Sequence, residues 1–143
     1  VDTMLETVAV KYYKQGYNCA ESIILAGNEF YQLNLDPTVS AAFAVYGGGC
    51  GCGDVCGAII GAMAVASRYF VKGKAHDDKA FVRKIGVTLM RNMEAKFGAR
   101  KCMNIKPVWH NPDPDIKCVN TVTAAAEVLE ATIRQLQEEK EAA

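Results

Sequence analysis

The residues best suited to chemistry are the six cysteines of the chain, Cys19, Cys50, Cys52, Cys56, Cys102 and Cys118. A cysteine thiolate is both a nucleophile and a metal ligand. An even number of cysteines would suggest disulfides in a secreted protein. However, the first residues are polar and acidic rather than typical of an export signal, and half of the chain is hydrophobic, which allows a core without cross-links. We therefore expect metal binding or redox chemistry in the cytoplasm.

Helix signals are frequent along the chain and place the cysteines near helix ends. They predict helices over about residues 3–15, 19–32, 37–46, 54–71, 77–97 and 120–136. The signals include capping boxes at Thr3–Glu6 and Asn18–Glu21, Asp54 as a cap, Asp77 or Asp78 as the start of a helix, and Gly98 as a stop. Residues 47–53, Gly-Gly-Gly-Cys-Gly-Cys-Gly, are too rich in glycine for a regular element. We expect residues 99–119, which hold three prolines, to be a long irregular segment.

Apolar residues recur at helical spacing in two of the predicted helices, 77–97 and 120–136. One stripe is Phe81, Ile85, Leu89, Met93 and Phe97, and the other is Val122, Ala126, Leu129, Ile133 and Leu136. No repeat or linker divides the chain. We predict an all-α fold, a single-domain antiparallel bundle of about six helices over residues 1–143.

The predicted helix directions gather the cysteines. If consecutive helices run antiparallel, as short connections favour, all six cysteines fall at one pole of the bundle. The starts of the helices at residues 19, 54 and 120 face the same pole. Helix N-termini carry partial positive charge, so we expect them to favour thiolate over thiol or to stabilise an anionic metal–sulfur centre.

The segment Cys56-Gly57-Ala58-Ile59-Ile60-Gly61 resembles the motif of a redox-active protein family named for a C…CGAxxG…C…C cysteine pattern. The resemblance covers nearly the whole chain and implies that the four recurring cysteines of the family are Cys19, Cys56, Cys102 and Cys118. It implies that Cys50 and Cys52 are additional. A similar domain occurs in split-Soret cytochromes, where it is associated with an iron–sulfur centre, and this implies a cluster here by analogy.

Three hypotheses stay open for the cysteines. The first is an electron-transfer centre, most readily a 2Fe–2S cluster, held by Cys19, Cys56, Cys102 and Cys118, with Cys50 or Cys52 able to replace a ligand. The second is metal-free thiol–disulfide chemistry, in which Cys50 and Cys52 form a strained disulfide and Cys56 is a nucleophile of low pKa. The third is a structural zinc ion or static disulfides in a binding module. Whether the protein is an enzyme stays open.

Several other functions are not expected. The formal net charge is zero, which argues against a nucleic-acid partner, and the apolar run 55–66 is shorter than the roughly 20 residues of a membrane span. The chain lacks Cys-x-x-Cys-His, so covalent c-type haem is not expected, and the glycine segment lacks the Lys-Ser/Thr of a nucleotide-binding loop. The redox partner protein is unidentified.

Two further points concern packing. Gly57 and Gly61 form a face of small residues that could pack within the chain or across a homodimer. We interpret His110 as a surface residue rather than a ligand, beside Trp109, which packs its loop onto the bundle.

Overall fold

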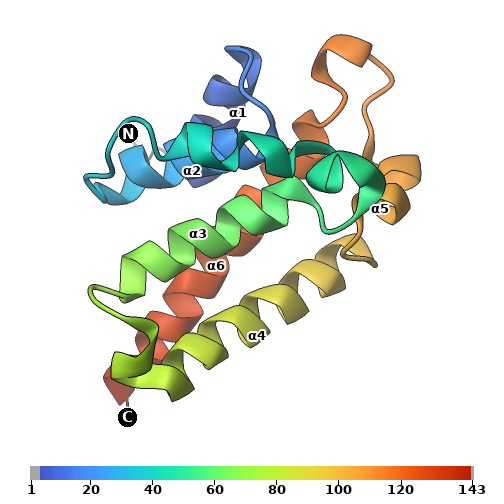
Figure 1. Ribbon diagram of the computed structural model, residues 1–143. Coiled ribbons are helices and arrows are strands. Elements are labelled where there is room, and N and C mark those ends of the chain that lie inside the picture. The colour runs from blue at the N-terminus through green and yellow to red at the C-terminus, as the bar shows by residue number, and fades with distance from the viewer. Residues whose placement is uncertain (1–3, 143) are drawn as a thin grey trace.

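The computed structural model describes residues 4–142 and is all-α, as predicted (Figure 1). The helices are α1 (Leu5–Lys14), α2 (Cys19–Tyr31), α3 (Gly57–Phe70), α4 (Lys79–Phe97), α5 (Cys102–Trp109) and α6 (Val119–Ala142). Shorter 3-10 turns are η1 (Ser40–Tyr46), η3 (Ala75–Asp78) and η4 (Pro114–Ile116), and η2 (Gly49–Gly53) is a π-type turn. Within the described residues there is no β-strand, only an isolated antiparallel bridge between Val55 and Lys101.

The long helices pack as a layer that carries the other elements at one end. Figure 1 shows α3, α4 and α6 side by side, with α4 running back in the direction opposite to α3. Helices α1 and α2 and the turn η1 pack across the end where α3 and α6 begin. The glycine-rich turn η2 and helix α5 contact each other at that same end. The cysteines lie in η2 or at the starts of α2, α3, α5 and α6.

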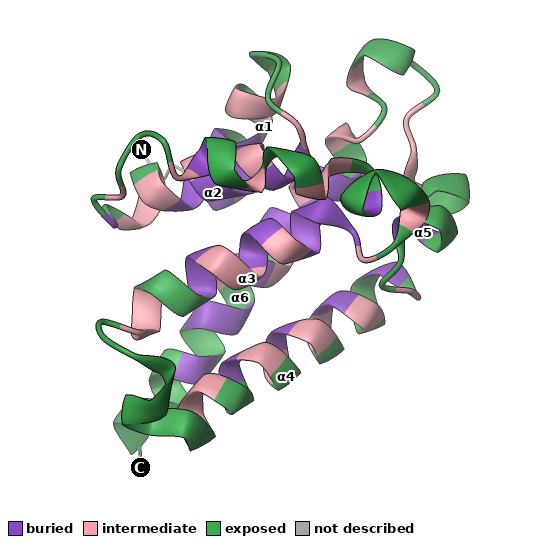
Figure 2. Cartoon of the chain, viewed as in Figure 1, coloured by how far each residue is buried: buried purple, intermediate pink, exposed green. Residues whose placement is uncertain are grey.

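The predicted apolar stripes form the core. Ile85, Leu89, Met93 and Phe97 are buried on α4, although Phe81 at the start of the stripe is only partly buried. The stripe of α6 is buried from end to end: Val122, Ala126, Leu129, Ile133 and Leu136. Figure 2 shows the buried side of α4 turned toward α3 and α6. Burial of these faces is the main stabilisation of the fold.

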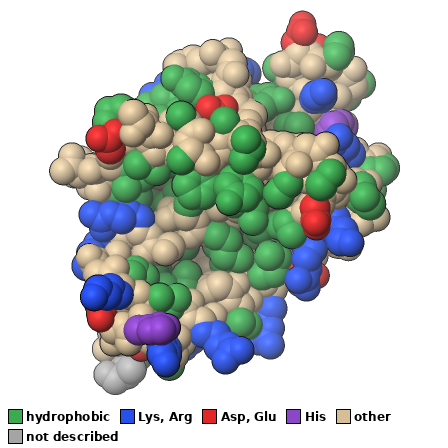
Figure 3. Space-filling model, viewed as in Figure 1, with side chains coloured by type: hydrophobic (Ala, Val, Ile, Leu, Met, Phe, Trp, Pro, Cys, Tyr) green, Lys and Arg blue, Asp and Glu red, His purple; other side chains and the backbone are tan. Residues whose placement is uncertain are grey.

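The surface is divided between charged and apolar regions. Figure 3 shows apolar side chains gathered across the middle of one face, with Lys and Arg side chains around its margin. None of the helices in residues 4–142 combines the length and the apolar character needed to cross a bilayer.

Several local signals act as predicted. Asn18 and Glu21 form the reciprocal capping box of α2, since each side chain accepts a backbone N–H of the other residue at 3.0 Å. Asp78 caps α4 by accepting from Phe81 N at 3.1 Å, and Gly98 ends that helix with φ of 73°. The predicted capping box of the first helix includes Thr3, which lies outside the described residues.

Three predicted boundaries were wrong. Residues 37–46 do not form an α-helix, since only the short 3-10 turn η1 is present, and most of its side chains are exposed and have no core to pack against. Asp54 does not cap α3, because its carboxylate accepts from the adjacent Val55 N, and Cys56 occupies the N-cap position. Residues 99–119 are not irregular throughout.

Helix α5 forms in that last segment despite its proline. Pro107 lies inside the helix and lacks an N–H, which removes a single helical hydrogen bond, the one to the carbonyl of Met103. Burial of Cys102 and Ile105 on the inner face of α5 offsets this loss. A prediction from helix propensity alone therefore missed α5, because propensity does not include the stabilisation that packing gives at this position.

Candidate functional site

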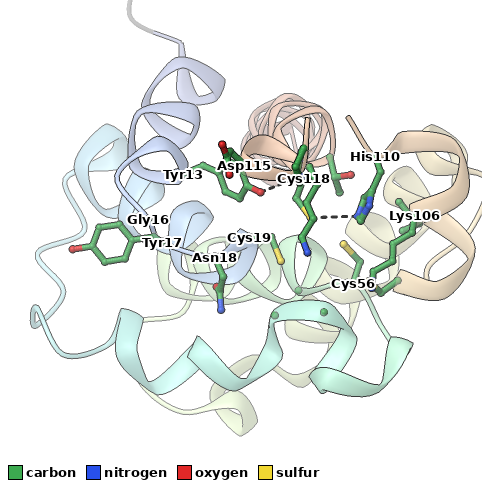
Figure 4. A pocket seen from close by; sticks show the side chains of 18 of the residues that line it. Tyr13, Gly16, Tyr17, Asn18, Cys19, Cys56, Lys106, His110, Asp115 and Cys118 are labelled. Carbon is green, nitrogen blue, oxygen red and sulfur yellow. Dashed lines mark hydrogen bonds between the residues drawn. The ribbon is translucent and has the colours of Figure 1, made fainter. Parts of the chain in front are cut away.

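Four cysteines from four separate helix starts line one cavity of about 450 Å³: Cys19, Cys56, Cys102 and Cys118. Cys19 and Cys102 are the first residues of α2 and α5. Cys56 is the N-cap of α3, and Cys118 immediately precedes α6. Figure 4 shows Cys19, Cys56 and Cys118 pointing into this cavity from different elements. The fold thus brings together thiols that lie up to a hundred residues apart in the chain.

Small residues at the start of α3 let α2 approach closely. A β-carbon at Gly57 would stand 2.7 Å from Cys19 Sγ and 2.7 Å from the Tyr46 carbonyl oxygen. One turn later, a β-carbon at Gly61 would stand 2.7 Å from the Ala20 carbonyl oxygen. Glycine at both positions therefore seats the start of α2 against the start of α3, which brings Cys19 and Cys56 to the same cavity.

Backbone hydrogen bonds hold Cys56 and Cys102 beside each other. Cys102 N donates to the Asp54 carbonyl at 2.7 Å, and Cys56 N donates to the Arg100 carbonyl at 2.9 Å. Gly49 packs under this bridge with φ of 65°, and a β-carbon there would be 2.8 Å from Cys102 Cβ. This pairing explains why the glycine-rich segment is needed although its own cysteines do not line the cavity.

Comparison with known proteins agrees with this arrangement. Residues 17–132 match the model of a family described as "Putative redox-active protein (C_GCAxxG_C_C)". The chain belongs to this family. In this member the central motif reads Cys56-Gly57-Ala58-Ile59-Ile60-Gly61, so its first two residues stand in the reverse of the order in the family label. No curated protein and no solved structure matched the chain.

The fourth cavity cysteine of this C_GCAxxG_C_C protein, Cys118, is held by two side chains. Its backbone N–H donates to the Tyr13 hydroxyl oxygen at 3.0 Å, which ties the start of α6 to α1. Its Sγ lies 3.5 Å from His110 Nε2 (Figure 4). Cys118 is only half-buried, whereas Cys19, Cys56 and Cys102 are at most 8% exposed. Cys118 is therefore the member of the group closest to solvent.

His110, which we interpreted from the sequence as a surface residue, is only partly exposed. The ring is partly buried, lines the cavity and contacts Cys118, because α5 and η4 turn the segment back over the cavity. The role expected of Trp109 is confirmed, since its ring packs edge-on against Phe97 with centroids 4.9 Å apart. The order of residues gave no signal for the His110–Cys118 contact, which depends on how this segment folds back.

Burial makes the thiols of Cys19 and Cys56 harder to ionise than their positions at helix starts predicted. Burial raises the pKa of Cys19 to about 12, although the backbone N–H groups of Gly48 and Ala20 act in the opposite direction. Burial also raises the pKa of Cys56, despite the N–H groups of Ile59 and Ala58. The backbone N–H groups thus favour the thiolate, as expected, but burial outweighs them, so the expectation that Cys56 is a nucleophile of low pKa was wrong.

Charges at the mouth of the cavity act mainly on Cys118 and His110. Burial raises the pKa of Cys118, and the Tyr13 hydroxyl and the ammonium groups of Lys117 and Lys106 oppose that rise. Burial, followed by the same two lysines, lowers the pKa of His110. A neutral imidazole next to Cys118 can accept a proton, and the lysines favour negative charge at the cavity mouth.

Cys50 and Cys52 stand apart from the other four. Both are exposed in η2, and neither lines the cavity. Cys50 has φ of 60°, and Cys52 Sγ donates to the Gly49 carbonyl at 3.5 Å. All six cysteines are free thiols in the structure, so the suggested Cys50–Cys52 disulfide is not formed there.

The four cavity thiols are spread around the cavity and do not converge on one point. Among residues 4–142, no three His, Cys, Asp or Glu side chains are grouped tightly enough to hold a metal ion as they stand. Thr121, one turn after Cys118, also lines the cavity, and its hydroxyl is buried. Sequence reasoning missed Thr121, Tyr13 and His110 as cavity residues, although the i, i+3 spacing of Cys118 and Thr121 was a usable signal.

Proposed function

We propose that this chain is an electron-transfer protein that holds an iron–sulfur cluster, of the 2Fe–2S type, through Cys19, Cys56, Cys102 and Cys118. The observation that carries the proposal is the lining of one cavity of about 450 Å³ by these four thiols. Four cysteine thiolates are the usual ligand set of such a cluster. The description of the family as redox-active points to the same chemistry. When bound, the cluster would supply one-electron redox chemistry.

The size of the cavity favours a cluster over a single zinc ion. Zinc with four sulfurs at about 2.3 Å would require those sulfurs to lie within roughly 4 Å of one another. No such tight group is present in residues 4–142, and a single ion would fill little of 450 Å³. The four sulfur ligands of a cluster lie further apart than those of a single zinc ion. The cysteine side chains would therefore have to move less to bind a cluster than to bind zinc.

The chain contributes charge stabilisation and shielding. Burial raises the pKa of Cys19 and of Cys56, so a bound cation would help these thiols to lose their protons. Once they are thiolates, the backbone N–H groups of Gly48 and Ala20 at Cys19, and of Ile59 and Ala58 at Cys56, favour the negative charge. Burial of Cys19, Cys56 and Cys102 keeps water away from three of the four sulfurs.

The test is purification under strict anaerobic conditions, followed by iron, sulfide and zinc analysis and a visible absorption spectrum. We expect iron and acid-labile sulfide in equal amounts in the wild type, and their loss in C56A and C102A. The variant with both Cys50→Ser and Cys52→Ser is the matched control and should retain both. A colourless protein that stays free of iron after anaerobic reconstitution would overturn the proposal, and stoichiometric zinc would indicate the structural alternative.

A second candidate is thiol–disulfide exchange at Cys50 and Cys52. The observation in its favour is that both thiols are exposed and separated by one glycine in a turn. The two thiols would pass two electrons and two protons to a partner disulfide and form one S–S bond themselves. In this case the double Cys50→Ser, Cys52→Ser variant, and not C56A, would lose reducing activity toward a small disulfide.

A further inference from the structure

Thr121 carries a buried hydroxyl that has no hydrogen-bond partner in the structure. The residue is 4% exposed, and no group among residues 4–142 forms a hydrogen bond with its Oγ. It lines the same cavity as the four cysteines. Because a buried hydroxyl without a partner is costly, its conformation and position call for a partner that occupies the cavity.

The other threonines of α6 show that this is not a general property of the helix. Thr123 Oγ donates to the Val119 carbonyl at 2.8 Å, which is the usual way for a helical threonine to satisfy its hydroxyl. Thr132 is fully buried, and its Oγ accepts from Asn92 Nδ2 at 2.9 Å. Of these three threonines, only Thr121, in the first turn of α6, has a hydroxyl without a hydrogen-bond partner, and only Thr121 lines the cavity.

The position of Thr121 relative to Cys118 suggests what the partner is. Cys118 directly precedes α6 and Thr121 lies in the first turn of that helix, so the two residues are neighbours, and both line the cavity. Three other buried residues that line the cavity are cysteines, Cys19, Cys56 and Cys102. A thiolate or sulfide is a hydrogen-bond acceptor, and Thr121 offers the donor that it needs.

We propose that the Thr121 hydroxyl donates a hydrogen bond to a sulfur atom of the centre held in this cavity, and so sets its reduction potential. The inference rests on the proposed function. A donor near a cluster sulfur stabilises negative charge, and it does so more strongly in the reduced state, which carries one more electron. Thr121 therefore raises the potential above the value that the four cysteines alone would give.

The test compares Thr121→Val, Thr121→Ser and Thr123→Val in the cluster-free and cluster-loaded protein. Valine keeps the shape of threonine and removes the hydroxyl. In the cluster-free protein we expect T121V to melt at the wild-type temperature or above, because it removes a hydroxyl that has no partner. In the loaded protein we expect T121V to lose part of the rise in melting temperature that the cluster confers, and to have a more negative potential.

The other two variants separate the hydroxyl from effects on packing. T121S keeps the donor and should keep the wild-type potential. T123V removes the hydrogen bond to Val119, so it should lower the melting temperature equally in both forms and leave the potential unchanged.

The outcomes distinguish the inference from the proposed function. A wild-type protein that binds no cluster overturns both. A loaded T121V protein with wild-type potential and wild-type stabilisation overturns the inference alone. A T121V protein that is less stable than the wild type only in the cluster-free form also overturns the inference. In that case the hydroxyl would have a hydrogen-bond partner, such as an ordered water, when no cluster is bound.

Discussion

Gly57 faces Cys19 so closely that a β-carbon on the glycine would stand 2.7 Å from the cysteine Sγ. The same β-carbon would also stand 2.7 Å from the Tyr46 carbonyl oxygen, so an added methyl group would clash with both a side chain and the backbone. The contact joins the starts of α2 and α3, and with them two of the four cavity cysteines. The glycine of the Cys-Gly-Ala motif thus has a direct physical role at the site.

Gly57→Ala should destabilise the protein by about 1–3 kcal/mol, the usual cost of forcing an extra group into a packed site. The starts of α2 and α3 must move apart, so binding of the proposed cluster should weaken as well. Urea unfolding and iron content measure the two effects. Gly86→Ala is the matched control, since nothing lies within 4 Å of a β-carbon there, and it should stabilise α4 by about 0.4–1 kcal/mol. Equal stability changes in both variants would contradict the packing argument.

Alkylation of the metal-free protein should follow exposure of the cysteines. Cys50 and Cys52 are exposed and should react first with iodoacetamide, and half-buried Cys118 should follow. Cys19, Cys56 and Cys102, at 8%, 4% and 8% exposure, should stay unmodified until the protein unfolds. Peptide mass spectrometry over time gives the order. Modification of Cys56 as fast as Cys52 would mean that the start of α3 is open in solution.

Tyr13→Phe should destabilise the protein by about 1–2 kcal/mol. The substitution removes the hydroxyl oxygen that accepts from Cys118 N at 3.0 Å, and it leaves that N–H without its acceptor at the start of α6. Thermal or urea unfolding provides the measurement. Tyr17→Phe is the control, because Tyr17 is exposed and also borders the cavity. If Y17F cost as much as Y13F, the hydrogen bond to Cys118 would not be the cause.

The contribution of Glu29 should depend on pH. Hydrogen bonds from the Lys11 ammonium at 2.9 Å and then from the Tyr12 hydroxyl hold the pKa of Glu29 below its ordinary 4.5. Because the folded-state pKa is the lower one, the stabilisation is complete above 4.5 and is lost as the pH falls through the lowered value. Both members of the ion pair are nearly half exposed, so the effect is only about 0.2–1 kcal/mol.

The measurement is urea unfolding of Glu29→Gln and wild type at pH 7 and pH 3. The variant should be less stable at pH 7, and the difference should shrink at pH 3. Glu138→Gln, an exposed position on the same protein without an ion pair in the described residues, should show no such pH dependence. A constant difference at both pH values would contradict the assignment to charge.

Much of the helical framework could be predicted from local signals. The capping pair Asn18–Glu21, the cap at Asp78 and the stop at Gly98 act over three or four residues, so they operate wherever the chain folds. The stripe around Leu89 and Met93 likewise follows from helical periodicity. These features determined the all-α class and most of the helix positions. Helix α5 was missed because its stability comes from burial of Cys102 and Ile105 rather than from propensity.

The sequence by itself determined that the protein is helical and that its reactive residues are cysteines near helix starts. Only the tertiary structure decided which cysteines share a cavity. Cys50 and Cys52 are the cysteines nearest to Cys56 in the sequence, yet they do not line the cavity that Cys56 lines. It also decided that burial outweighs the helix N-termini at Cys19 and Cys56, and that His110 and Thr121 border the same space. The physical reason is that burial and contact depend on which distant segments cover a side chain, and no local pattern records that.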